Sequence, residues 1–158
     1  MTQINSYGSR RDYLPAFLRS GAGAAGGHTE AQLLSREESR ALEAVSLNRF
    51  PQLPSGEIGW EDASCSERLW YEDDEEGVRG VTELLTRNVR QDAHVVIFWG
   101  TLVMPSVRLP VNDVVRHVAD ILDEFPHFWV YSSEDRVLIE FLPDGRVTVA
   151  DIPDEAPA

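Results

Sequence analysis

Residues 127–151 read HFWVYSSEDRVLIEFLPDGRVTVAD. Three runs in this stretch are rich in β-branched and aromatic residues, and two short polar segments separate them. Such runs predict strands over 127–131, 136–142 and 146–151 that are joined by tight turns. The second turn, Pro143-Asp144-Gly145, is a three-residue hairpin loop in which glycine supplies the positive φ. The stretch therefore predicts an antiparallel β-meander.

Both turns place the same side chains on one face of this meander. The hairpin loop pairs Phe141 with Val147, and a four-residue loop over 132–135 pairs Val130 with Val137. Because side chains alternate between the two faces of a strand, each register keeps the apolar positions together. The apolar face comprises Phe128, Val130, Val137, Ile139, Phe141, Val147 and Val149. We expect this face to be buried.

A helix and two further extended segments precede the meander. Residues 94–99, HVVIFW, are apolar strand formers and predict a buried central strand that ends at Gly100. Residues 101–109 are expected to be extended. Asn112 is a suitable N-cap for a helix over 112–125, which should pack on the meander. Its apolar stripe comprises Val114, Val115, Val118, Ile121, Leu122 and Phe125.

The N-terminal part of the chain predicts helices and loops. Ser35 and Glu38 have the spacing of a capping box, and Thr29 is an alternative cap for the same helix. Prolines and a glycine predict a loop over 48–59. Apolar residues at helical spacing predict a second helix over 75–88.

These elements predict the fold class α+β, with an antiparallel meander of about four strands packed on a helix and further helices in the N-terminal part. Residues 1–59 are expected to form an N-terminal helical segment that contains a glycine-rich linker at 21–27. Residues 60–158 are expected to form an acidic α+β domain.

The charge of the chain is strongly negative and unevenly distributed. Its 158 residues include 27 acidic residues against 14 basic residues, all of which are arginine, so the net charge is −13. Residues 1–60 are neutral, and the densest acidic stretch is 61–76. Such a field repels phosphate backbones and anionic lipids, so nucleic acid and membrane are excluded as direct partners and a basic protein is favoured. The alternative is that the acidity only maintains solubility.

The second face of the meander carries aromatic and charged residues. They are His127, Trp129, Tyr131, Leu138, Glu140, Leu142, Arg146 and Thr148. Either the N-terminal helices cover this face, or it is an exposed protein-binding surface of aromatic residues rimmed by charges.

Candidate catalytic and metal sites are weakly supported. Asp113, His117, Asp120 and Glu124 have the spacing of one helix face and are the residue types that bind divalent metals, but the same pattern is typical of a solvated helix face. Cys65 lies among acids that disfavour its thiolate. No phosphate-binding loop or catalytic triad signature is present. We therefore expect neither a cofactor nor an enzyme.

An export signal is a further candidate near the N-terminus. Ser9-Arg10-Arg11-Asp12-Tyr13-Leu14 is similar to a twin-arginine motif, and a Gly/Ala stretch follows it. Arg19 interrupts the apolar region behind the motif, so a short amphipathic turn followed by a linker is the simpler interpretation.

Four stretches resemble bacterial immunity proteins of polymorphic toxin and contact-dependent inhibition systems. They are VIFWGTLVMPSVRLP (96–110), NDVVRHVADILDEF (112–125), FWVY (128–131) and VLIEFLPDG (137–145). The resemblance implies a small, non-catalytic cytoplasmic protein that binds and neutralises a cognate toxin domain. An acidic secretion chaperone or nucleic-acid mimic, and a small metal-binding enzyme centred on 113–124, are the alternatives.

The anionic character of the chain would suit a nuclease-type toxin, which must be basic to hold phosphate. Under this hypothesis the acidic residues steer the encounter, and aromatic and charged side chains anchor the complex. The predicted partner-binding residues are Trp70, Glu72, Asp73, Asp74, Glu75, Glu76, Trp129, Tyr131 and Glu140.

Overall fold

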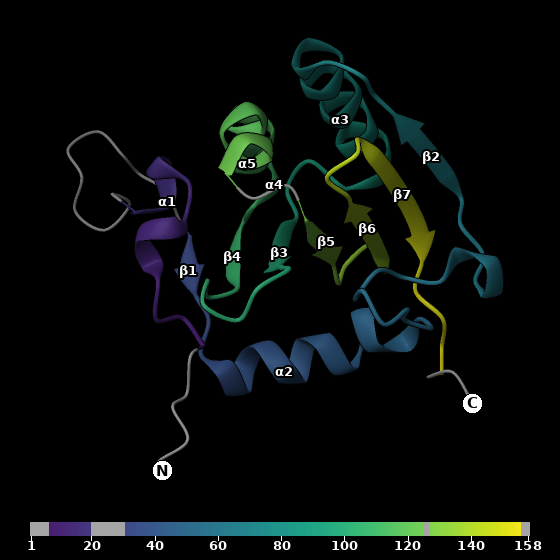
Figure 1. Cartoon of the computed structure of the whole chain (residues 1–158), viewed down its shortest axis with the longest axis horizontal. Helices are drawn as coiled ribbons and strands as arrows, with labels where there is room; N and C mark the ends of the chain where they lie inside the picture. Colours follow the sequence, from purple (N-terminus) through teal and green to yellow (C-terminus); the bar gives the residue numbers. More distant parts are fainter. Residues whose placement is uncertain (1–6, 20–30, 125–126, 156–158) are drawn as a thin grey trace.

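A seven-stranded antiparallel sheet forms the centre of the structure, a computed structural model that describes residues 7–19, 31–124 and 127–155 (Figure 1). From edge to edge, its strands are β1 (Gln32–Leu33), β4 (Val107–Pro110), β3 (His94–Trp99), β5 (Phe128–Ser132), β6 (Val137–Phe141), β7 (Arg146–Asp151) and β2 (Glu67–Trp70). The predicted α+β class is confirmed, and β3, β5, β6 and β7 form the expected four adjacent strands. Strands from earlier in the chain extend the sheet at both edges.

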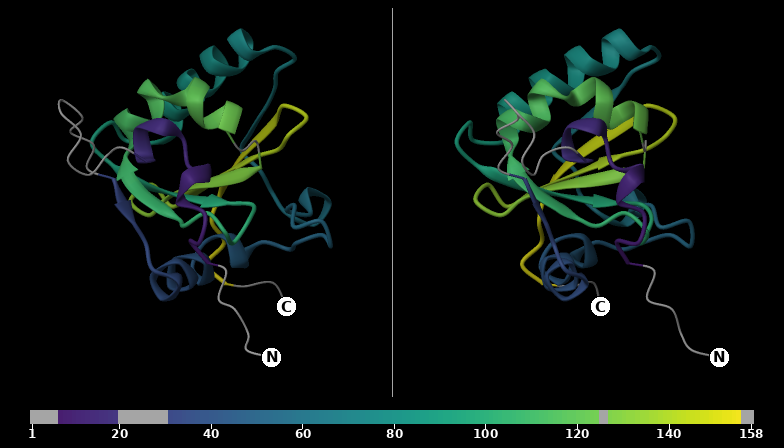
Figure 2. Two further views of the ribbon diagram at one scale, coloured as in Figure 1. Left: turned by 60° about the vertical axis from the view of Figure 1, so that its left-hand side comes forward. Right: turned by 90° about the vertical axis from the view of Figure 1, so that its left-hand side faces the viewer.

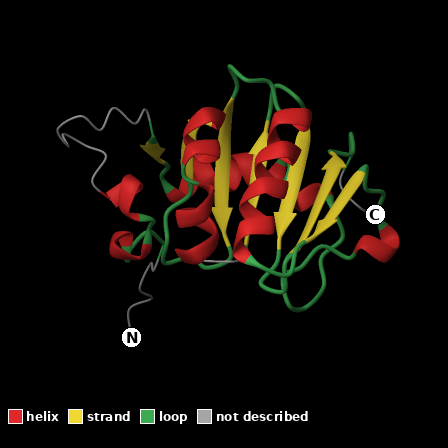
Figure 3. Ribbon diagram, turned by 90° about the horizontal axis from the view of Figure 1, so that it is seen from above, coloured by secondary structure: helices red, strands yellow, loops and turns green. Residues whose placement is uncertain are grey.

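Helices cover both faces of the sheet (Figure 2). One face carries α1 (Ala16–Arg19), α3 (Asp74–Asn88), α4 (Val111–Arg116) and α5 (Val118–Glu124), and Figure 3 looks down on this layer. The other face carries α2 (Arg36–Ala44) and the segment that follows it. Single 3-10 turns lie at Arg11–Tyr13, Leu47–Arg49 and Trp60–Asp62.

The larger hydrophobic core lies between the sheet and α3, α4 and α5. All seven positions predicted for the apolar face of the meander belong to it. Leu84 and Leu85 of α3 and Ile121 of α5 pack into the same core and are almost fully buried. Leu14 and Leu18 from the N-terminal segment join it as well. The predicted packing of the helix on the meander is confirmed.

One of the two predicted registers is correct and the other is shifted. Phe141 pairs with Val147 as expected, and Gly145 adopts a positive φ of 92° in the hairpin loop. Val130, however, pairs with Ile139 and not with Val137. The difference arises because β5 continues to Ser132, which moves the turn along the chain. A shift of two residues leaves every side chain on its predicted face, so the core is unaffected.

The single helix predicted over 112–125 is in fact two short helices. They are separated at His117, whose φ of −119° and ψ of 25° lie outside the helical range. Asn112 is not the N-cap, because the helix follows β4 directly and Pro110 occupies the cap without a side-chain hydrogen bond. The N–H of Val111 instead donates to the carbonyl of Ala93 at 3.0 Å.

The N-terminal helix begins where the capping box predicts. The Glu38 N–H donates to Ser35 Oγ at 3.0 Å, and the Ser35 N–H donates to Glu38 Oε1 at 2.9 Å. The helix predicted over 75–88 is confirmed as α3. Thr29, the linker at 21–27, Phe125 and Pro126 lie outside the described residues.

The second face of the sheet is covered and not exposed. Trp129 and Tyr131 are 6% and 7% exposed, and they pack in a second core with Leu47, Phe50 and other residues from the N-terminal half. Glu140 is only 1% exposed. The expected exposure of these three side chains is not observed, because the segment after α2 lies over them; this is the alternative in which the N-terminal part of the chain covers the face.

Glu140 holds this covering segment to the sheet. Its carboxylate accepts hydrogen bonds from the Ile58 N–H at 2.8 Å, from Trp60 Nε1 at 2.8 Å and from Trp129 Nε1 at 3.1 Å. Two of these donors belong to the loop before β2 and one belongs to the neighbouring strand. Hydrogen bonds to a charged group contribute about 1.5–3 kcal/mol each, so this is a strong link between the layers.

We expect Glu140→Gln to lower the free energy of unfolding by about 2–4 kcal/mol, because the amide NH₂ would face N–H donors and leave buried groups unpaired. The measurement is urea unfolding followed by tryptophan fluorescence. Glu134→Gln, the same change at an exposed position, is the control and should alter stability by less than about 0.5 kcal/mol. Equal stability of the two variants would contradict this role of Glu140.

Candidate partner-binding site

Trp70 is the most exposed large hydrophobic side chain among the described residues, at 70%. It ends β2, the strand at one edge of the sheet. Its Nε1 donates to the carbonyl of Asp144 at 3.2 Å, and Arg146 is its pairing partner on β7. The indole is therefore held in place while its ring stays in solvent. This predicted site residue is where a partner can reach it.

The acidic run Glu72–Glu76 begins two residues after Trp70 and leads into α3, which starts at Asp74. Asp73 is the N-cap, and its Oδ1 accepts from the Glu76 N–H at 2.8 Å. Glu76 Oε1 accepts from the Glu72 N–H at 3.2 Å. All five side chains are exposed. Negative charge is stabilised at a helix N-terminus, so the fold tolerates this density of carboxylates.

Two further acids join this run from elsewhere in the chain. The pKa of Tyr71 is raised above its ordinary value of 10.0, first by burial and then by Asp74, Asp123 and Asp144. These three carboxylates come from α3, from α5 and from the loop between β6 and β7. Acids from three separate elements thus act on one ring. We call residues 72–76 together with Asp123 and Asp144 the acidic lobe.

The packing of α3 on β2 makes this site rigid. A Cβ at Gly77 would lie 2.7 Å from the Tyr71 ring, and a Cβ at Gly80 would lie 2.7 Å from a Leu69 methyl. Both glycines therefore allow a close approach that a larger residue would prevent. Glu67, at the other end of β2, accepts hydrogen bonds from Arg87 and Asn88 of α3. The Arg87 guanidinium is the main cause that lowers the pKa of Glu67.

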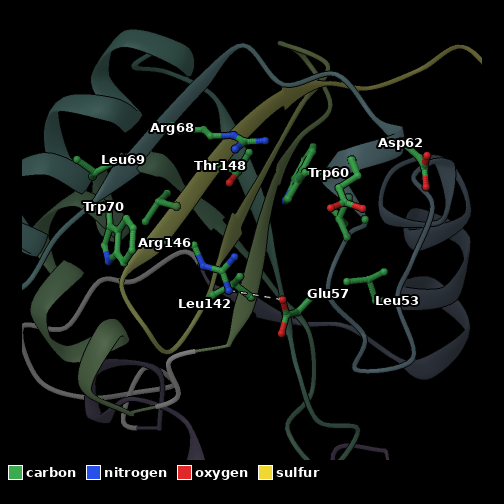
Figure 4. A pocket seen from close by; sticks show the side chains of 14 residues that line it. Leu53, Glu57, Trp60, Asp62, Arg68, Leu69, Trp70, Leu142, Arg146 and Thr148 are labelled. Carbon is green, nitrogen blue, oxygen red and sulfur yellow. Dashed lines mark ion pairs between the residues drawn. The ribbon is translucent and has the colours of Figure 1, made fainter.

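A groove of about 630 Å³ lies beside Trp70 on the second face of the sheet (Figure 4). One wall is formed by the loop before β2, with Leu53, Glu57, Trp60 and Asp62, and the other by the strands, with Arg68, Trp70, Arg146 and Thr148. An ion pair of 3.8 Å between Arg146 and Glu57 links the two walls. Its apolar and mixed-charge lining suits side chains of a protein partner.

The residues proposed for metal binding are not assembled into a site. Asp113 is buried and accepts from Arg116 at 2.7 Å. The ring of His117 stacks on Phe17 at 3.9 Å, and its Nδ1 lies 3.6 Å from Asp120 Oδ2. Within residues 7–19, 31–124 and 127–155, no group of three or more His, Cys, Asp or Glu could hold a metal ion.

Cys65 and the arginine pair near the N-terminus also have structural partners. Cys65 Sγ accepts from Arg68 Nε at 3.1 Å. Arg10 pairs with Asp12 at 2.8 Å, and its guanidinium lies 4.1 Å from the centre of the Tyr13 ring. The Arg10 N–H donates to the carbonyl of Val103, so this segment is held against the loop before β4. In the described part of the chain, no helix is long and apolar enough to cross a membrane.

The sequence predicted the core of this site but missed its surroundings. Trp70 and residues 72–76 lie together, whereas the predicted Trp129, Tyr131 and Glu140 are buried elsewhere. Asp123 and Asp144 were not predicted. Asp144 is adjacent in space because its hairpin loop packs against Trp70, and no local pattern in the sequence indicates this.

Comparison with known proteins agrees with this description of a binding protein. The family model of CdiI immunity proteins, EcoliA0-like, matches residues 27–150, which is most of the chain. No curated protein matches the sequence.

We expect Asp123→Asn to lower the pKa of Tyr71 toward its ordinary value, because one of the negative charges that disfavour the phenolate is removed. The measurement is an alkaline titration of ¹³C-labelled tyrosine by NMR. Asp92→Asn, at an exposed position outside the acidic lobe, is the control and should leave the titration unchanged.

The same shift predicts a pH dependence of stability. Because the pKa of Tyr71 is higher in the folded than in the unfolded chain, the folded state retains the phenol proton more strongly. The contribution of Tyr71 to the free energy of unfolding is complete below pH 10 and is lost as the pH rises through the pKa of the folded state.

For the Asp123→Asn variant, an unchanged titration of Tyr71 would show that Asp123 does not belong to the acidic lobe.

Proposed function

This chain belongs to the CdiI immunity protein family, and from that premise we propose that the toxin it neutralises is a basic, nuclease-type domain. Proteins of this family bind and neutralise a cognate toxin, so the partner is a protein. We further propose that the binding surface consists of Trp70 and the acidic lobe. Neutralisation in the cytoplasm, where a nuclease finds its substrate, is part of this proposal.

The single observation that carries the proposal is the gathering of acids around Tyr71. Residues 72–76 are five consecutive exposed acids at the start of α3, and Asp74 of this run acts on the Tyr71 phenol together with Asp123 and Asp144 from two other elements. The exposed Trp70 directly precedes this tyrosine. A nuclease needs a cationic surface to hold phosphate, and a dense anionic surface is complementary to it. The net charge of −13 adds a long-range attraction between this chain and a cationic toxin.

Trp70 gives this surface a candidate anchor. Residues that dominate binding energy are enriched in tryptophan, and they are surrounded by contacts that exclude water. Here the indole lines the groove, and its hydrogen bond to the carbonyl of Asp144 limits its motion. A held ring loses little conformational entropy when it is buried against a partner.

The proposed mechanism requires binding alone. The acids accelerate the encounter, the indole and groove hold the complex, and the bound protein keeps the nucleic acid from the toxin by steric and electrostatic exclusion. No bond is made or broken by this chain.

The first test neutralises charges in the lobe that have no part in capping α3. We expect Glu72→Gln, Asp74→Asn and Glu75→Gln together to lower the association rate constant for the toxin about tenfold at low salt and to weaken its salt dependence. The measurement is stopped-flow binding to the recombinant cognate toxin domain.

The matched control neutralises the exposed acids Glu37, Asp92 and Glu134, which changes the net charge by the same amount at other places. If the effect is local to the acidic lobe, the association rate constant of this control should stay within about twofold of that of the unmodified protein. Equal slowing of both triple variants would mean that only total charge matters and would contradict the assignment of the lobe.

The second test removes the anchor. We expect Trp70→Ala to raise the Kd for the toxin about 30-fold, mainly through faster dissociation, since truncation of a central aromatic residue costs about 2 kcal/mol or more. Leu102→Ala, at a residue that is 57% exposed on the loop before β4, is the control and should leave the Kd unchanged. Surface plasmon resonance measures both rates, and an unaltered Kd in Trp70→Ala would exclude the indole from the interface.

A further inference from the structure

The outer edge of β2 is a second feature of the same region. Among the described residues, β2 pairs with β7 alone, so one side of this strand faces away from the sheet. We propose that an extended segment of the toxin adds to this edge as a further β-strand, with basic residues beside the acidic lobe. The inference rests on the proposed function and specifies how the partner is held.

The register of β2 shows which backbone groups are available. The Tyr71 N–H donates to the carbonyl of Gly145 at 3.2 Å, so these two residues form a hydrogen-bonded pair. In an antiparallel ladder such pairs alternate with pairs whose N–H and C=O groups turn outward. Arg68, opposite Thr148, and Trp70, opposite Arg146, occupy the outward-turning positions. The backbone N–H and C=O groups of these two residues therefore offer two donors and two acceptors at the outer edge of β2.

Nothing in the described structure lies beyond these groups. Arg68 and Trp70 are both exposed. Helix α3 lies over the face of the sheet, with β2 at the outer edge in Figure 1. The opposite edge is β1, which has only two residues. Of the two sheet edges, β2 is thus the longer template for an added strand.

The edge is also held rigid before any partner arrives. Glu67 at its start accepts from Asn88 at 3.0 Å, and Leu69 and Tyr71 pack against the glycines of α3. A prearranged edge needs little ordering when a strand adds to it, and strand addition gains affinity from main-chain hydrogen bonds. Alternate side chains of the added strand would lie on the face of the groove, next to Trp70.

The charges around β2 select the occupant. The acidic lobe follows its C-terminal end, and Glu61 and Asp62 line the groove that its side chains border. A second copy of this chain, with a net charge of −13, would bring the same acids together and be repelled. A strand with lysine or arginine at its ends is attracted instead. The occupant is therefore a segment of the basic toxin.

Hydrogen exchange of single amides tests this directly. In the free protein the amides of Arg68 and Trp70 should exchange rapidly, while that of Leu69, which faces β7, is protected. In the complex with the cognate toxin domain, we expect exchange at Arg68 and Trp70 to slow at least tenfold. The measurement is NMR-detected exchange on the full chain. A complex in which both amides exchange at the free rate would overturn the strand addition and leave the proposed function intact.

A pair of variants at one position separates backbone from side chain. Arg68→Ala removes the guanidinium and keeps the outward N–H, whereas Arg68→Pro removes the N–H without removing a hydrogen bond to β7. We expect the proline variant to bind the toxin about tenfold more weakly than the alanine variant. Equal affinities of two folded variants would overturn the proposal, and if the proline variant does not fold, the exchange experiment on the unmodified chain decides.

Two further outcomes are decisive. Self-association of the free chain through β2, detected by light scattering and abolished in Arg68→Pro, would replace the toxin strand by a second copy and overturn the proposal. Absence of any complex between the unmodified chain and the toxin domain would overturn both this inference and the proposed function.

Discussion

The buried carboxylate of Glu140 joins the loop before β2 to the sheet. It lies in the middle of the sheet, is 1% exposed, and accepts hydrogen bonds from Ile58, Trp60 and Trp129. An unpaired charge at this depth would be strongly destabilising, so the donors and the acceptor require one another. The loop before β2 is thereby fixed to the sheet, and so is the wall of the groove that Glu57 and Trp60 form.

This constraint limits which parts of the sheet a partner can reach. With α3, α4 and α5 on one face and the segment after α2 on the other, both broad surfaces of the sheet are buried. The surface that we propose for a partner therefore lies at the periphery and consists of the edge of β2, the start of α3 and the loop at Asp144. Charged groups are concentrated there because they stay hydrated, and Trp70 is the exception that points to a binding role.

The elements that the sequence predicts correctly are those whose signals are local. The hairpin at Gly145, the capping box of Ser35 and Glu38 and the periodicity of α3 each depend on residues a few positions apart. The sequence did not decide whether the face that carries Trp129 is covered or exposed. The reason is that the covering depends on contacts such as the one between Ile58 and Glu140, which are 82 positions apart. β2 was missed for a related reason: its four residues, ERLW, alternate too briefly to be recognised without β7.

The site shows the same division between local and distant signals. Residues 72–76 lie within a few positions of Trp70 in the sequence, whereas Asp123 and Asp144 come near Tyr71 only through the fold. Such a concentration of like charge ordinarily opposes folding, and the start of α3 offsets this cost. Asp73 and Glu76 are occupied by backbone N–H groups, so Glu72, Asp74 and Glu75 are the acids of this run whose charges are not used in capping. The helix terminus therefore tolerates a negative surface that a loop of the same composition would tolerate less well. Placing the acids at the start of a capped helix is one way in which a chain can concentrate negative charge in one region and still fold.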